Sequence, residues 1–145
     1  MISRSSQNMS ASDNKQLMQD IFSELAKGNG QPFVDALAND IQWTWMGTVK
    51  WSKTFNGKDA VLNELLNPGT AMLTAPFFKY FAQRFIAEDD YVVVEARGAN
   101  TLRDGRSYDN RYCWVCRLAE GKLTELHEYM DTELVTLTFS ASDKA

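Results

Sequence analysis

The sequence has few of the residues from which metal and redox centres are built. It contains a single histidine and two cysteines among 145 residues. One histidine beside scattered carboxylates is a poor ligand set for a transition metal. Cys113 and Cys116 lie three positions apart in a segment rich in aromatic and β-branched residues, and a strand would direct them to opposite faces. We therefore expect two half-buried small apolar side chains, without a metal or a redox motif.

Sequence signals for several partners and chemistries are also missing. No apolar run approaches the roughly 20 residues of a membrane-spanning helix. The net charge is -4, and no cluster of Lys and Arg could neutralise a phosphate backbone. The motifs of a nucleophilic serine (G-x-S-x-G) and of phosphate-binding loops (G-x-G-x-x-G, G-x-x-x-x-G-K-[ST]) are absent. From these absences we expect that the protein binds neither a membrane nor a nucleic acid. If it is an enzyme, we expect it to work without a cofactor.

The chain length is typical of one domain. Residues 1–13 belong to a stretch rich in Ser and Asn that has no apolar segment of the kind found in secretion signals. We expect a disordered N-terminal tail, one domain over residues 14–138, a flexible C-terminal tail over residues 139–145, and a cytoplasmic location.

Hydrophobic spacing predicts helices first and strands afterwards. Apolar residues at helical spacing predict a helix over Asn14–Lys27, a short one after Pro32, and a third over Asp59–Asn67 ended by Pro68 and Gly69. Period-two alternation predicts strands over Ile41–Gly47, Phe77–Ala87, Tyr91–Asn100, Tyr108–Leu118 and Lys122–Val135, the last four joined by short polar turns. This order indicates an α+β fold with the helices on one face of a mostly antiparallel sheet.

Alternation also predicts which side chains point inward. In the strand from Tyr91, the small apolar set Val92, Val94, Ala96 and Gly98 is expected to face inward. Asn110, Tyr112 and Trp114 form the aromatic face of their strand, and Trp43 and Trp45 share the apolar face of the first strand. The last strand is ambiguous, because neither of its faces is wholly apolar: one carries Glu125, His127, Tyr129 and Asp131, and the other carries Leu126, Glu128 and Met130. If the first set faces the helices, polar groups converge in an aromatic-walled pocket, the usual form of a small-molecule site.

These segments resemble the nuclear-transport-factor-2-like superfamily, and in particular its SnoaL-like branch of polyketide cyclases and relatives of ketosteroid isomerase. The similarity runs from about Lys15 to Val135. It is carried by D-I-Q-W-T-W-M-G from Asp40, N-G-K-D-A-V from Asn56, V-V-V-E-A-R-G-A-N from Val92, D-G-R-S-Y-D-N-R-Y-C-W-V from Asp104 and E-G-K-L-T-E-L-H-E-Y-M-D-T-E-L from Glu120.

The resemblance implies a cone of three helices on a strongly curved, mostly antiparallel sheet, with a central pocket and a homodimer formed through the outer sheet faces. It also implies a role for Asp131, which matches the aspartate that acts as acid or base near the end of the last strand in the cyclases. Read from the residues alone, Asp131 could instead cap a turn at the strand's end or pair with an arginine.

The leading hypothesis is a cofactor-independent cyclase or isomerase that acts on a small hydrophobic carbonyl compound. Asp131 would move a proton next to the carbonyl, while His127, Tyr129 or Tyr112 would donate to the developing enolate oxygen. Trp43, Trp45, Asn110, Tyr112 and Trp114 would form the substrate-binding wall. The alternatives are a pocket that holds a small hydrophobic or aromatic ligand without converting it, and a protein-interaction domain that works through its outer sheet face.

Overall fold

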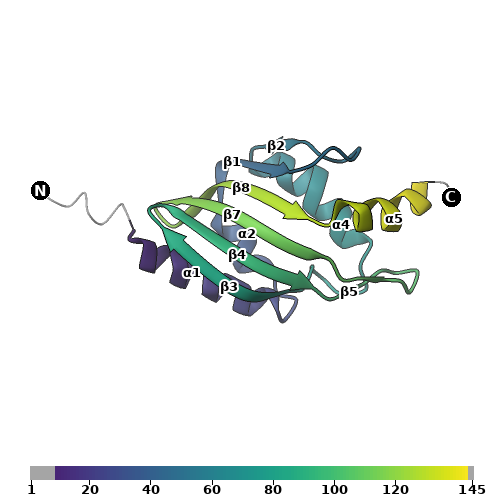
Figure 1. Cartoon of the computed structure of the whole chain (residues 1–145), viewed down its shortest axis with the longest axis horizontal. Coiled ribbons are helices and arrows are strands. Elements are labelled where there is room, and N and C mark those ends of the chain that lie inside the picture. Colours follow the sequence, from purple (N-terminus) through teal and green to yellow (C-terminus); the bar gives the residue numbers. More distant parts are fainter. Residues whose placement is uncertain (1–8, 144–145) are drawn as a thin grey trace, which may run out of the picture.

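A layer of helices covers one face of a curved, mixed, six-stranded sheet (Figure 1). The computed structural model describes the backbone of residues 9–143 and the side chains of residues 9–140. The strands follow the order β2-β1-β8-β7-β4-β3, in which only β1 and β8 are paired in parallel. Their bounds are β1 Leu37–Trp45, β2 Thr54–Asn56, β3 Tyr80–Glu88, β4 Tyr91–Gly98, β7 Arg111–Ala119 and β8 Lys122–Met130. The predicted α+β class is confirmed.

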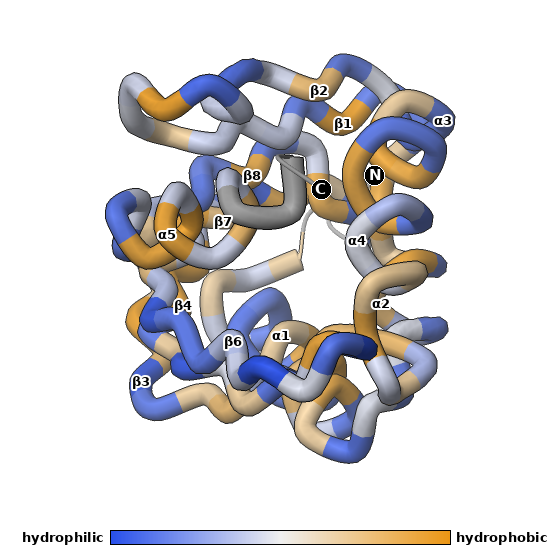
Figure 2. Tube along the Cα trace, turned by 90° about the vertical axis from the view of Figure 1, so that its right-hand side faces the viewer, coloured by the Kyte–Doolittle hydropathy of each residue, from blue (hydrophilic) through white to orange (hydrophobic). Residues whose placement is uncertain are grey.

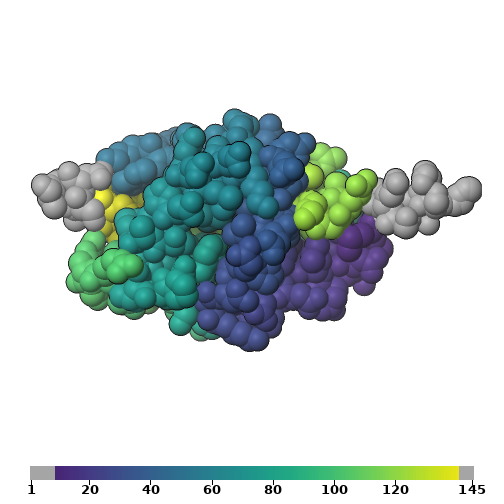
Figure 3. All heavy atoms as spheres, turned by 180° about the vertical axis from the view of Figure 1, so that it is seen from behind, coloured from purple at the N-terminus to yellow at the C-terminus, as the bar shows by residue number. Residues whose placement is uncertain are grey.

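The helical segments lie on the side of the molecule seen in Figure 3, where α1, α2 and the residues that follow β2 cover the sheet. A separate two-stranded sheet pairs β5 with β6. The bounds of these elements are α1 Ala11–Leu25, α2 Gln31–Ala36, α3 Lys58–Ala60, η2 Val61–Leu66, α4 Asn67–Ala71, α5 Thr132–Asp143, β5 Asn100–Thr101 and β6 Ser107–Tyr108. No helix among the described residues combines the length and apolar character that a membrane crossing needs.

Helix α1 shows how local sequence fixes the start and the end of an element. The Ser10 hydroxyl accepts a hydrogen bond from the backbone N–H of Asp13, and the Asp13 carboxylate accepts one from the backbone N–H of Ser10. This reciprocal cap starts the helix a few residues before the predicted Asn14. Past its other end, Gly28 adopts φ +83°, a conformation that glycine accepts without strain.

The inward faces predicted for β4 and β7 are confirmed. Val92, Val94, Ala96 and Gly98 of β4 are buried, as are Tyr112, Trp114, Cys116 and Leu118 of β7. Val94 pairs with Trp114 across the two strands, so these small and large side chains share one face. Apolar and polar residues are interspersed along the chain (Figure 2). The larger of two buried apolar clusters lies between the sheet and the helical layer, and the smaller contains Leu73, Leu102, Tyr108 and Val135.

The third helical segment was predicted to end at Pro68 and Gly69, and this is wrong. The segment continues from Lys58 to Ala71, with a π-helical stretch in its middle. Pro68 follows directly on the π-helical stretch, where the regular ladder of hydrogen bonds between residues four apart is already interrupted. The helix can therefore pass through a Pro-Gly pair that usually ends one.

The last predicted strand is also too long. Strand β8 ends at Met130, and residues Thr132–Asp143 form α5, whose range extends into the predicted tail. The Asp131 carboxylate accepts a hydrogen bond from the backbone N–H of Leu134, the bond expected of a residue that caps a helix. Residues 1–8 and 144–145 of the predicted tails lie outside the described residues.

Candidate functional site

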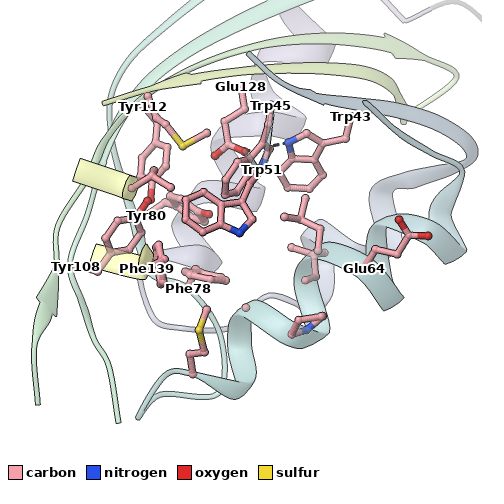
Figure 4. A pocket seen from close by; sticks show the side chains of 17 residues that line it. Trp43, Trp45, Trp51, Glu64, Phe78, Tyr80, Tyr108, Tyr112, Glu128 and Phe139 are labelled. Carbon is pink, nitrogen blue, oxygen red and sulfur yellow. Dashed lines mark hydrogen bonds between the residues drawn. The ribbon is translucent and has the colours of Figure 1, made fainter. Parts of the chain in front are cut away.

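A cavity of about 250 Å³ opens between the sheet, the helical segment η2–α4 and helix α5 (Figure 4). Most of its wall is aromatic or aliphatic, and its polar groups are two carboxyls, three phenols and the indole N–H groups. The lining residues are Trp43, Trp45, Trp51, Glu64, Leu65, Leu66, Pro68, Gly69, Met72, Phe78, Tyr80, Tyr108, Tyr112, Glu128, Met130, Val135 and Phe139. An apolar wall with a few convergent polar groups is the common form of a small-molecule site.

Glu128 is the polar centre of this wall. It lies on β8 between β1 and β7, and its side chain is only 3% exposed. The indole N–H of Trp43 donates to Oε1 over 3.0 Å, and that of Trp114 donates to Oε2 over 3.1 Å. Trp114 is the direct cross-strand partner of Glu128. The carboxyl group is therefore held from both neighbouring strands, each oxygen by one indole. Figure 4 shows Glu128 beside Trp43, the donor from β1.

The surroundings of Glu128 act on its pKa in opposite directions. Burial removes water from the carboxylate and raises its pKa from 4.5 to about 7, although the indole N–H groups of Trp114, Trp43 and Trp45 favour the charged form. Near neutral pH the group can therefore be present both as acid and as base, which is the condition for efficient proton transfer.

Trp45 differs from the other two indoles. It lines the cavity and pairs directly with Glu128 across β1 and β8. Its Nε1 atom is buried, yet it has no hydrogen-bond partner among the residues that the structure describes. Its N–H still acts on the Glu128 carboxyl as a donor and lowers the pKa of that group, although it lies outside the geometry of a full hydrogen bond. The cavity wall thus contains a buried donor beside a titratable acid.

Three phenols contribute hydroxyl groups to the same cavity. Burial raises the pKa values of Tyr80 and Tyr112 well above 10, and it raises the pKa of Tyr108 to about 12 against the opposing effect of a hydrogen bond from Asn110. The side-chain amide of Asn110 donates to the Tyr108 hydroxyl oxygen over 2.9 Å. All three phenols therefore keep their protons at neutral pH, and one of these protons is used in a hydrogen bond from Tyr112 to Tyr108.

Three of the residues predicted for the substrate-binding wall line the cavity, namely Trp43, Trp45 and Tyr112. Trp114 and Asn110 are buried behind this wall, at 1% and 0% exposure. Trp114 holds Glu128, whereas Asn110 holds Tyr108 and also bonds the backbone of Asp131. The structure therefore gives these two residues contacts with lining residues and not with the cavity itself.

The orientation predicted for the last strand is wrong. Leu126 and Glu128 are buried, while Tyr129 is 43% exposed and Asp131 is exposed where it caps α5. His127 is half-buried on the outer face opposite Val115. Asp131, His127 and Tyr129 therefore lie outside the lining of the cavity. The opposite face is favoured because it buries Leu126 and brings a carboxyl within reach of two buried indole N–H groups.

Glu128 is the functional candidate that the sequence argument missed. Trp43 and Trp114 were predicted to point inward, and a buried indole N–H needs an acceptor. A carboxyl group on the neighbouring strand is the strongest acceptor available, so these two tryptophans carried a usable signal for the face of β8.

The described residues contain no group of three or more His, Cys, Asp and Glu side chains that could hold a metal ion. Cys116 is buried and Cys113 is half-buried, and both thiols are free. They lie on opposite faces of β7, as their spacing predicts.

Comparison with known proteins identifies relatives of this fold. The model of the SnoaL-like domain family matches residues 18–126. An NTF2-like protein of unknown function from Burkholderia pseudomallei K96243 superimposes with a TM-score of 0.72 at 20% identity, over 86% of this chain and 95% of that one. No curated protein matches the sequence.

Two further solved structures carry functional descriptions in their names. One is a putative SnoaL-like polyketide cyclase from Jannaschia sp. CCS1, with a TM-score of 0.69 at 17% identity over 93% of this chain and 98% of that one. The other is a putative isomerase from Bacillus subtilis, with a TM-score of 0.73 at 12% identity over 91% of this chain and 96% of that one. At these identities the likeness concerns the fold.

Proposed function

The chain belongs to the SnoaL-like domain family, and from this premise we propose that it is a cofactor-independent enzyme of the cyclase or isomerase type. Its substrate is a small hydrophobic carbonyl compound bound in the cavity, and Glu128 transfers the proton. The family and the structural neighbours named as cyclase and isomerase support this reaction class. The proposal keeps the chemistry expected from the sequence but moves the acid and base from Asp131 to Glu128.

One observation carries the proposal. Glu128 is a carboxyl group in the wall of an apolar cavity, with a pKa raised to about 7 and with both oxygens held in place. A general base works best when its pKa lies near the working pH and its position is fixed. Structural carboxyls in apolar cores are rare because they are costly to bury, so a buried, perturbed carboxyl in a cavity wall indicates function.

The size of the cavity limits the substrate. An apolar cavity of about 150 Å³ holds benzene. Scaled by volume, a cavity of about 250 Å³ admits a compound of about ten non-hydrogen atoms, or one ring with a fused or attached second ring. The aromatic wall favours a flat, apolar compound of this size.

The proposed step moves one proton. The Glu128 carboxylate accepts the proton from the carbon next to the carbonyl: the C–H bond breaks, an O–H bond forms on Glu128, and the electron pair moves to the carbonyl oxygen to give an enolate. Glu128 then returns the proton to the same or another carbon. The protonated phenols of the cavity wall supply donors for the enolate oxygen.

Hydrogen–deuterium exchange tests this step without knowledge of the natural substrate. Indan-2-one has about the size estimated for the cavity, and exchange of its α-protons in D₂O is followed by proton NMR. The wild-type protein should accelerate the exchange, and Glu128→Gln should lose about 10²- to 10⁴-fold of that acceleration. Glu125→Gln, on the same strand but outside the cavity lining, is the matched control and should behave as wild type. Equal exchange with wild type and Glu128→Gln would contradict the proposal.

A binding module without catalysis is the second candidate. It is favoured by the fact that both oxygens of Glu128 already accept hydrogen bonds from indoles, so the carboxyl is satisfied within the protein. In that case the wild-type protein would bind indan-2-one, as shown by isothermal titration calorimetry, but would not accelerate the exchange of its protons.

We also propose that the outer sheet face forms a homodimer. This face carries the exposed Ile86 and Tyr129, at 55% and 43% exposure, and the half-buried Val93 and Val115, which pair across β4 and β7. Salt bridges lie beside them, between Arg84 and Glu95 and between Arg117 and both Asp90 and Glu125. An apolar centre with charged surroundings is typical of protein interfaces.

A further inference from the structure

The indole N–H of Trp45 is the least engaged of the three indole donors beside Glu128. Trp43, Trp45 and Trp114 all place indole N–H groups near Glu128, and two of the three make hydrogen bonds to it. The Trp45 Nε1 atom is buried and has no partner within the described part of the chain. A buried donor without a partner destabilises a fold, and native proteins keep few of them.

The position of this donor indicates its use. Trp45 is the last residue of β1, it lines the cavity, and it is the register partner of Glu128. Figure 4 shows Trp45 and Glu128 side by side in the cavity wall. A ligand atom that reaches the carboxyl group of Glu128 therefore also comes close to the indole of Trp45.

We propose that Trp45 selects the substrate by its oxygen: the indole N–H donates a hydrogen bond to a carbonyl or enol oxygen of a ligand whose adjacent carbon faces Glu128. This inference rests on the proposed function, because it assigns the substrate of the same cavity. It assigns Trp45 as the residue that recognises the oxygen of this carbonyl substrate, and it predicts that pure hydrocarbons of the same size bind more weakly. An indole N–H is a donor only, so the group that it recognises must be an acceptor.

The chemistry of enolisation fits such a pair of groups. When Glu128 removes the proton, negative charge develops on the ligand oxygen, and a donor fixed beside the carboxyl stabilises that charge more than it stabilises the neutral ketone. Trp43 and Trp114 hold Glu128 while Trp45 keeps its donor available. The three indoles therefore have two tasks, the first two positioning the base and the third binding the substrate.

The test compares a ketone with its hydrocarbon analogue. Binding of indan-2-one and of indane is measured by isothermal titration calorimetry for the wild type, for Trp45→Phe and for Trp51→Phe. Phenylalanine keeps an aromatic ring and removes the N–H. Trp51 also lines the cavity and packs edge-to-face on Phe139 at 6.4 Å, so its variant is the matched control for the loss of indole area.

We expect Trp45→Phe to weaken indan-2-one about 3- to 10-fold more than it weakens indane, as the loss of one hydrogen bond implies. Trp51→Phe should change both affinities by the same factor. A wild type that does not prefer the ketone, or a Trp45→Phe variant that keeps the full preference, would overturn the inference.

The α-proton exchange of indan-2-one separates this inference from the proposed function. The ketone preference depends on Trp45, whereas the exchange depends on Glu128. A ketone preference that is lost in Trp45→Phe, together with no exchange by the wild type, would support Trp45 as the oxygen donor and refute Glu128 as the base. Exchange that is lost in Glu128→Gln, together with an unchanged ketone preference in Trp45→Phe, would support Glu128 as the base and refute Trp45 as the oxygen donor.

Trp45→Phe should fold, because it removes only the weakest of the three indole donors beside Glu128. Trp43→Phe removes the donor to Glu128 Oε1 and should be less stable than Trp45→Phe in thermal unfolding. A purely structural role of Trp45 would reverse this order and leave the ketone preference unchanged.

Discussion

The free energy of unfolding should fall as the pH rises and Glu128 ionises. The pKa of Glu128 is about 7 in the folded protein against 4.5 as its ordinary value. Below 4.5 the group is protonated in both the folded and the unfolded chain, and it does not affect the balance between them. Between 4.5 and 7 only the unfolded chain releases the proton, so the folded state becomes less favoured as the pH rises.

The size of the effect follows from the shift. The pKa difference between 4.5 and about 7, at 1.36 kcal/mol per pH unit, corresponds to a loss of about 3 kcal/mol in the free energy of unfolding by pH 8. Urea unfolding followed by circular dichroism at about pH 4.5, 6 and 8 measures this loss. Other groups titrate as well, so the comparison that isolates Glu128 is the difference between wild type and Glu128→Gln.

Glu128→Gln also lowers the free energy of unfolding directly, because its amide NH₂ group would face one of the two indole N–H donors. That decrease does not depend on pH, whereas the lost titration does. From pH 4.5 to pH 8 the free energy of unfolding of wild type should therefore fall by about 3 kcal/mol relative to that of Glu128→Gln, and Glu125→Gln should follow the wild type. A constant gap would show that the indoles cancel the effect of burial, and would refute the reasoning that Glu128 is a base near neutrality.

Three other changes test separate parts of the structure. Trp114→Phe removes a hydrogen bond that lowers the pKa of Glu128, so the pH at which α-proton exchange becomes fast should move upward in a pH-rate profile. Asp131→Ala removes the cap of α5 and should cost about 1 kcal/mol in urea unfolding, while Asp131→Asn, which can still cap, should cost less and keep full exchange activity. Loss of exchange in Asp131→Asn would instead restore Asp131 as the acid or base. Val115→Lys places a charge at the centre of the outer sheet face and should shift the protein from dimer to monomer in analytical ultracentrifugation; a monomeric wild type would refute the dimer.

The sequence was sufficient for the fold wherever one face of an element is clearly apolar. Helix α1 buries Met18, Ile21, Phe22 and Leu25 at helical spacing, and its apolar face was predicted from that spacing. The strands β4 and β7 present one uniformly apolar face each, so their inward sets followed from alternation alone. The buried face of each of these elements can therefore be predicted from its own residues, without knowledge of its neighbours in the fold.

The candidate site was not predictable in the same way, because β8 has polar groups on both faces. A shift of one position moves every side chain of a strand to the other face, and the choice depends on residues of β1 and β7. Helix α5 was missed for a related reason. Asp131 was weighed as a possible cap, but the continuing apolar pattern over Leu134 and Val135 was assigned to the strand that precedes it.

The hydrogen bonds of the tryptophans decide between the two faces of β8. If Asp131 and His127 pointed inward, Leu126 would lie on the outer face and the indole N–H groups of Trp43 and Trp114 would lose their acceptor. Each buried donor left unpaired costs about 1 to 3 kcal/mol, and exposure of a buried leucine costs about 2 kcal/mol more. The observed face avoids these losses at the expense of burying one carboxyl, whose pKa rises as a result. The same requirement that orients the strand therefore also creates the titratable group in the cavity, and the chemistry proposed for this protein follows from how its indoles are satisfied.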